Sequence, residues 1–149
     1  MKRNNFSLSL KYFLLSALFW VTVDYTTVFN PDFARWVAHM PLIWAFYLGS
    51  PFIFSHLIYR YNWQGRRLFL AVLVCMVVCE LVLFNNYLLY TFPIMLLMIP
   101  IAICIYSFIT YVPMWLTDGT LKNHRGWTIF LTIVWLIVAF LNYASNTNP

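Results

Sequence analysis

Residues 68–117 read LFLAVLVCMVVCELVLFNNYLLYTFPIMLLMIPIAICIYSFITYVPMWLT, and these 50 positions contain a single charged side chain, that of Glu80. One helix of this length would extend about 75 Å at ~1.5 Å per residue, more than twice the ~30 Å hydrocarbon core of a bilayer. The stretch must therefore fold back once. The reversal is expected between Asn85 and Pro93, because Asn tolerates turn conformations and Pro suits the first turn of a new helix.

The composition of the whole chain excludes a water-soluble domain. Of 149 residues, 63% are hydrophobic and 21% aromatic, against 9 Lys and Arg and 4 Asp and Glu. Soluble proteins carry about a quarter charged residues, and so few charges cannot cover a surface that faces water. A disulfide-stapled secreted fold, a Rossmann domain and a nucleic-acid-binding domain are excluded together, and the lipid bilayer is the first expected partner.

Windows without Asp, Glu, Lys or Arg divide the rest of the chain. Residues 36–59 and 126–149 are two such windows of 24 positions, each long enough for one crossing. The N-terminal run imitates a secretory signal, but no small-x-small cleavage site follows, so we expect an uncleaved anchor. We predict an all-α, polytopic membrane bundle that forms one domain over residues 1–149. Its five transmembrane helices are expected at residues 8–28, 40–59, 68–88, 93–115 and 127–144.

The basic residues predict the orientation of this bundle. Lys and Arg are retained on the cytoplasmic side of short loops. Eight of the nine cations fall in alternate connecting segments and only Arg35 falls in another, which places the N-terminus inside and the C-terminus outside. A multi-pass protein of a bacterial or archaeal cytoplasmic membrane is expected. The inner cations that would face anionic lipid head groups are Arg60, Arg66, Arg67, Lys122 and Arg125.

Aromatic residues cluster near the expected membrane surfaces. Trp and Tyr favour the interface between lipid and water. The expected anchors are Trp36, Trp63, Tyr87, Tyr90, Trp115 and Trp127. Residues 30–39, which begin with Asn-Pro, are expected to form a short amphipathic helix on the outer face.

Two acids stand out within the apolar spans. Asp24 lies 13 residues beyond the basic marker Lys11, and Glu80 lies 13 beyond Arg67. Both helices should run from inside to outside, so both carboxylates are expected about 20 Å from the inner boundary, on facing sides of the first and third helices.

The second helix runs in the opposite direction and adds two candidates to this layer. Counting 13 residues back from Arg60 reaches Tyr47, with Ser50 one turn deeper. No Lys, Arg or His is expected at this depth. Two carboxylates without a counter-ion must share a proton, remain protonated or hold a cation. Alternatively, Asp24 reaches the outer interface and Glu80 is a protonated acid that bonds a neighbouring Tyr or Ser.

Signatures of enzymes, metal sites and cofactor sites are missing from the sequence. There is no H-E-x-x-H, G-x-S-x-G or Walker A stretch, so no catalytic residue, metal or cofactor is predicted. Cys75, Cys79 and Cys104 are expected to be buried packing residues. Breakers at Pro51 and Pro100 are expected to kink their helices. A loop cluster of His56, Asp118, His124 and Arg125 is the weaker alternative to solvated loop residues.

Three functional hypotheses remain open. The leading one is a non-enzymatic accessory or assembly subunit that binds a larger membrane protein. The second is a small transporter or channel protomer, functioning as a homo-oligomer, that couples protons or cations through Asp24 and Glu80. The third is an intramembrane enzyme acting on a lipid-linked substrate, for which the basic inner loops add no independent support.

Overall fold

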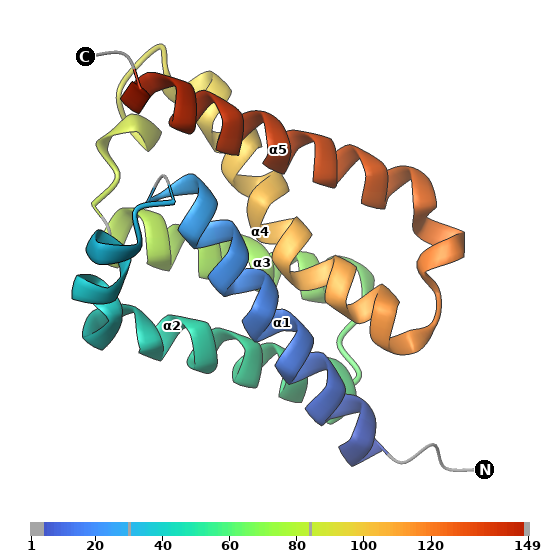
Figure 1. Cartoon of the computed structure of the whole chain (residues 1–149). Coiled ribbons are helices and arrows are strands. Elements are labelled where there is room, and N and C mark those ends of the chain that lie inside the picture. Colours follow the sequence, from blue (N-terminus) through green and yellow to red (C-terminus); the bar gives the residue numbers. More distant parts are fainter. Residues whose placement is uncertain (1–4, 30, 84, 148–149) are drawn as a thin grey trace.

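The computed structural model describes residues 5–29, 31–83 and 85–147, and every regular element in these ranges is a helix (Figure 1). The predicted all-α fold is confirmed. The elements in chain order are α1 (Asn5–Thr27), α2 (Phe33–Tyr59), α3 (Gly65–Val77), the π-helix η1 (Val78–Leu83), the 3-10 helix η2 (Tyr87–Leu89), α4 (Met95–Asp118), the 3-10 helix η3 (Leu121–His124) and α5 (Arg125–Thr147).

Three helical stretches are long and apolar enough to cross a membrane. They are Phe6–Thr27, Met95–Asp118 and Leu121–Ser145, and a fourth is gained if the two arms of the bent α2 form one crossing. This length and composition fit a multi-pass membrane protein. Several helices extend beyond one end of the predicted range because apolar windows mark the hydrocarbon depth, whereas a helix continues to its cap. For example, α4 continues to Asp118 and is capped by Gly119 in the left-handed conformation, with φ 72°.

The helices run up and down in an antiparallel bundle (Figure 1). The start of α1, the α2–α3 connection and the α4–α5 connection lie at one end of the molecule. We call it the basic end, because these connections include Arg60 and Lys122. The α1–α2 and α3–α4 connections lie at the opposite end, as does the end of α5. α1 is central and packs against α2, α4 and α5, while α3 packs chiefly against α4.

α2 has two arms. Phe33–Met40 and Ile43–Tyr59 meet at an angle of 73°, next to Pro41, whose ring removes a backbone donor. The short arm begins at Asp32, whose side chain accepts a hydrogen bond from the backbone N–H of Arg35 at 3.0 Å. A short helix therefore forms where one was predicted over residues 30–39. Asn30, the first residue of that prediction, lies outside the described residues.

The predicted helix over residues 68–88 is wrong in its second half. The α-helix ends at Val77, continues as the π-helix η1 to Leu83, and is followed by a turn in which Asn85 has a φ of 46°. The backbone N–H of Asn86 reaches back to the carbonyl of Glu80 at 2.8 Å, six residues earlier. This hydrogen bond between residues six positions apart ends the helix before the turn. The turn itself was predicted at this place, and α4 begins at Met95, two residues beyond Pro93.

The core follows a stripe along α1. Tyr12, Ser16, Trp20 and Val23 are buried, and they recur at the three- and four-residue spacing of one helix face. The same face meets a continuous buried stretch of α4, residues 106–110. The buried face of α1 therefore carries both polar and apolar side chains.

Candidate functional site

Asp24 lies on α1, one turn beyond the buried Trp20, and is half-buried. The phenol of Tyr47 on α2 donates a hydrogen bond to Asp24 Oδ2. The indole Nε1 of Trp36, on the short arm of α2, donates to the same phenol oxygen over 3.0 Å. These side chains form one hydrogen-bonded chain from Trp36 through Tyr47 to Asp24. The predicted contact between Tyr47 and an intramembrane acid is confirmed.

Glu80 lies in the π-helix η1 and takes a donor on each carboxylate oxygen. The Tyr106 hydroxyl on α4 donates to Oε1 over 3.0 Å, and the Asn86 side-chain amide donates to Oε2 over 2.8 Å. π-Helical turns are rare and are often found at functional sites. Here the turn holds the acid between α4 and the chain that leaves η1. Tyr106 was not among the predicted site residues, because counting 13 residues back from Lys122 reaches Ile109 and Tyr106 lies three residues further.

The two acids share no hydrogen-bond donor, because Asp24 bonds Tyr47 whereas Glu80 bonds Tyr106 and Asn86. Within the described ranges, no Lys, Arg or His side chain bonds either carboxylate. The expected direct interface between α1 and α3 is not a principal packing interface, because α1 packs chiefly against α2 and α4. Asp24 therefore takes its donor from α2, and Glu80 takes one of its donors from α4.

Ser50 does not join either acid. It lies beside the Cys75 thiol on α3, and the sulfurs of Cys75 and Cys79 are 4.0 Å apart. Ser50 lies about one helical turn further along α2 than Tyr47. At that position it is beside Cys75 rather than beside either acid. All three cysteines are free, with Cys79 buried and the others half-buried, as expected of packing residues.

A proline in α4 explains a further buried polar contact. Pro113 has no N–H, so the carbonyl of Ile109, four residues earlier, lacks its helical donor. The hydroxyl of Ser16 on α1 donates to this carbonyl oxygen over 3.2 Å, and Tyr12 donates to the adjacent carbonyl of Thr110 over 3.3 Å. α1 thus supplies donors to carbonyl oxygens near a proline, as expected where an apolar environment offers no water.

Two of the predicted interfacial anchors make contacts within the bundle. Trp115 is buried and stacks on the ring of His124, with centroids 4.5 Å apart. Trp36 is half-buried and bonds Tyr47. Trp20 is a third buried indole, 5.5 Å edge-on from the ring of Tyr106, and its Nε1 has no partner in the part of the chain that the structure describes.

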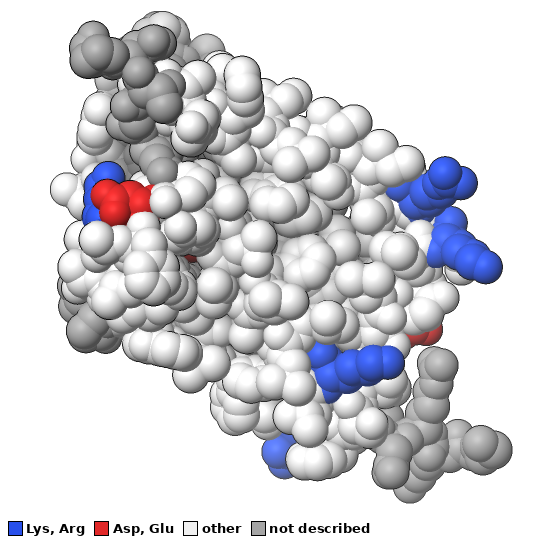
Figure 2. Space-filling view, viewed as in Figure 1, with Lys and Arg blue, Asp and Glu red and all other residues white. Residues whose placement is uncertain are grey.

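The predicted lipid-facing cations lie outside the core. Arg60, Arg66, Arg67, Lys122 and Arg125 are all exposed. Figure 2 shows blue side chains at the basic end, a broad uncharged surface between the ends, and a small patch of both charges at the opposite end. This distribution is the one expected of a protein that places its charges outside an apolar membrane core.

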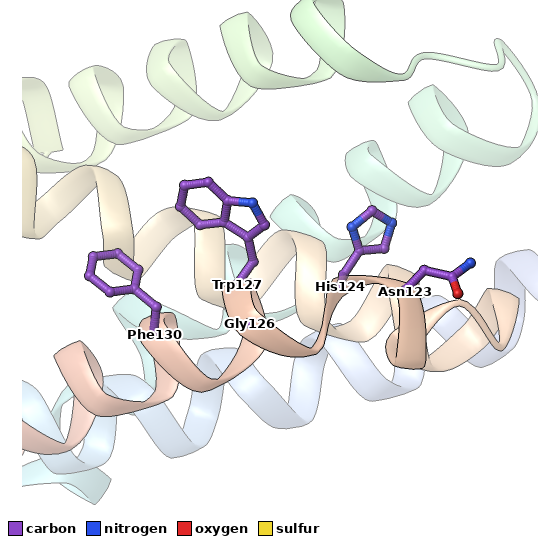
Figure 3. Close-up of a pocket in the computed structure, with 5 residues that line it drawn as sticks. All are labelled: Asn123, His124, Gly126, Trp127 and Phe130. Carbon is purple, nitrogen blue, oxygen red and sulfur yellow. The ribbon is translucent and has the colours of Figure 1, made fainter.

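The loop cluster considered from the sequence does not form. His124 stacks on Trp115, Asp118 accepts a hydrogen bond from Tyr59 over 3.0 Å, and His56 contacts its own helix. His124, Trp127 and Phe130 project to the same side of the chain and line an open hollow of about 590 Å³ beside η3 (Figure 3). Among the described residues, no group of three His, Cys, Asp or Glu side chains is arranged to hold a metal ion.

Comparison with known proteins gives no match to a family model, to a curated protein or to a solved structure. The arrangement of the side chains is therefore the basis for a functional proposal. Both acids accept hydrogen bonds from neutral donors, and several of these bonds join different helices. Hydrogen bonds of this kind stabilise the packing of helices. The carboxyl groups that accept them can also bind or release a proton.

Proposed function

We propose that this chain is a non-enzymatic accessory or assembly subunit in a cell membrane, and that its intramembrane polar residues fix the packing of its own helices. One observation carries the proposal. Three hydrogen bonds between interior side chains and groups on other helical elements carry it, namely Tyr47–Asp24, Tyr106–Glu80 and Ser16–Ile109. In lipid, such bonds stabilise packing because the alternative is an unsatisfied polar group.

The proposed arrangement has five crossings, with the N-terminus in the cytoplasm and the C-terminus outside. In addition to the four apolar stretches described above, α3 and η1 together form one crossing, the third along the chain. Gly65–Leu83 spans 19 residues, or about 28 Å at the ~1.5 Å rise of an α-helix. This count gives each end of the bundle the connections seen in Figure 1. It also places the basic end in the cytoplasm, in accord with the retention of Lys and Arg there.

The test of this function is purification from the native membrane in mild detergent, with the molar ratio of copurifying proteins measured by quantitative mass spectrometry. An accessory subunit should copurify with one membrane protein at a fixed ratio across detergents. Deletion of the gene should lower the abundance of that protein. A chain that purifies alone from several mild detergents, with no change in the membrane proteome on deletion, would contradict the proposal.

A proton- or cation-coupled role is the second candidate, and a specific observation favours it. Asp24 and Glu80 both accept hydrogen bonds from neutral donors, and no Lys, Arg or His among the described residues bonds either one. A carboxyl group without a cationic partner in a low-dielectric interior can serve as a proton-binding site. This candidate predicts pH-dependent proton flux in proteoliposomes that is lost in Glu80→Gln. The accessory role predicts no such flux.

A further inference from the structure

A groove of about 580 Å³ lies at the basic end, between the beginning of α1 and the last turns of α2. It is separate from the acids, since Asp24 lies toward the other end of α1 and Glu80 lies in η1. Three of its apolar residues, Phe6, Leu10 and Phe13, are four and three positions apart and so form one stripe along α1. Phe52 contributes from α2.

The apolar walls are open to the surroundings of the bundle. Phe6 is 80% exposed and Phe52 is 56% exposed. In a membrane these rings would face lipid. A groove with such walls and this volume matches the size of ligand pockets, which is on the order of 300–1,000 Å³, and suits a flexible hydrocarbon chain.

The polar end of the groove is cationic. Arg60 caps α2 and is exposed, and its guanidinium has no acidic partner among the described residues. His56, one turn earlier, has its Nδ1 3.1 Å from the carbonyl oxygen of Phe52. Because that oxygen can only accept, Nδ1 carries a proton, and Nε2 can donate a second hydrogen bond to an anionic group when the ring is in its imidazolium form. No Asp or Glu lines the groove. Tyr59 is one of the lining residues, and its hydroxyl donates a hydrogen bond to Asp118.

We propose that this groove binds one acidic phospholipid, with an acyl chain between α1 and α2 and the phosphate against Arg60 and His56. A guanidinium matches the geometry of phosphate oxygens and forms short, charge-assisted hydrogen bonds with them. A zwitterionic lipid would bring a quaternary ammonium close to the two basic side chains. The proposal requires a membrane location, but it requires neither the accessory role nor the orientation proposed above.

The test is native mass spectrometry of the full chain in nonionic detergent, with equimolar dioleoyl phosphatidylglycerol and dioleoyl phosphatidylcholine. The wild type should retain one phosphatidylglycerol in preference to phosphatidylcholine. Arg60→Gln should lower this retention about tenfold, because it removes a bond to a charged group. Ser9→Phe, which fills the groove from α1, should lower it similarly.

Arg67→Gln is the matched control, because it removes the same charge from an exposed position at the start of α3, outside the groove. It should change retention by less than about twofold, as expected of a screened surface charge. Arg60→Lys keeps the charge without the forked geometry, and should bind phosphatidylglycerol with intermediate strength. If Arg60→Gln does not fold, the lipid retention of Arg60→Lys still tests the role of Arg60.

Four results would each overturn the proposal. The first is an equal loss of lipid in Arg60→Gln and Arg67→Gln, and the second is equal retention of the two lipids by the wild type. The third is displacement of the lipid by excess sn-glycerol 3-phosphate, which would indicate a site for free phosphate. The fourth is a dimer that Ser9→Phe abolishes, which would place a second copy of the chain in the groove.

Discussion

The hydroxyl of Ser16 on α1 lies 3.2 Å from the carbonyl oxygen of Ile109 on α4, the carbonyl that Pro113 deprives of its helical donor. Both residues are buried. A membrane interior supplies no water to satisfy a carbonyl freed in this way. The contact therefore links the proline-containing turn of α4 to the position of α1.

Ser16→Ala is expected to lower the free energy of unfolding by about 1 kcal/mol, because a buried acceptor loses its donor. In a Pro113→Ala background, residue 113 regains its N–H and the same substitution should cost much less. Thermal unfolding in detergent, followed by circular dichroism, measures both. Thr22→Ala is the control, since the Thr22 hydroxyl is exposed and bonds only its own helix at Leu18. Equal losses in the two backgrounds would show that Ser16 does not serve the freed carbonyl.

Tyr47→Phe tests the chain of hydrogen bonds to Asp24. The variant removes the donor to Asp24 and the acceptor of the Trp36 indole, so two polar groups lose a partner. The expected destabilisation is about 2 kcal/mol, measured by unfolding in detergent. Tyr90→Phe provides the comparison, because its exposed hydroxyl bonds the exposed Asn85. A Tyr47→Phe variant as stable as Tyr90→Phe would mean that the chain adds nothing to stability.

Sequence patterns predicted the helical class, the turn at Asn85 and the contact of Tyr47 with an acid. These depend on local rules, namely apolar window length, the conformational tolerance of Asn and the rise per residue. The end of the third helix was missed because it depends on Asn86 closing back on Glu80. A window of apolar residues contains no information on hydrogen bonds of this kind.

The partners of polar residues were harder to predict than the burial of those residues. The spacing of polar residues along α1 could not show which helix would face them. Ser16 meets Ile109 only because Pro113 frees that carbonyl, and Tyr106 reaches Glu80 only because α4 packs beside α3. Such pairings depend on the packing of helices far apart in the sequence.

The proposed orientation predicts the outcome of reporter fusions. Fusions after residues 67 and 125 should act in the cytoplasm, and fusions after residues 35 and 149 should act outside, because Lys and Arg are retained inside. Paired cytoplasmic and external reporters at each site measure this. The fusion at residue 149 separates five crossings from four, since an active cytoplasmic reporter there requires an even number.

The most direct measurement compares Glu80→Gln and Glu80→Leu for thermal stability in detergent and for rescue of a deletion strain, including the amount of the copurifying partner. Gln keeps a polar group for Tyr106 and Asn86 but removes the charge, whereas Leu removes both. If the acids serve packing, the Gln variant should be close to the wild type in both assays, and the Leu variant should lose stability and partner together. A Gln variant that is normally stable but fails to restore function would contradict this role and would show that the charge of Glu80 itself is required.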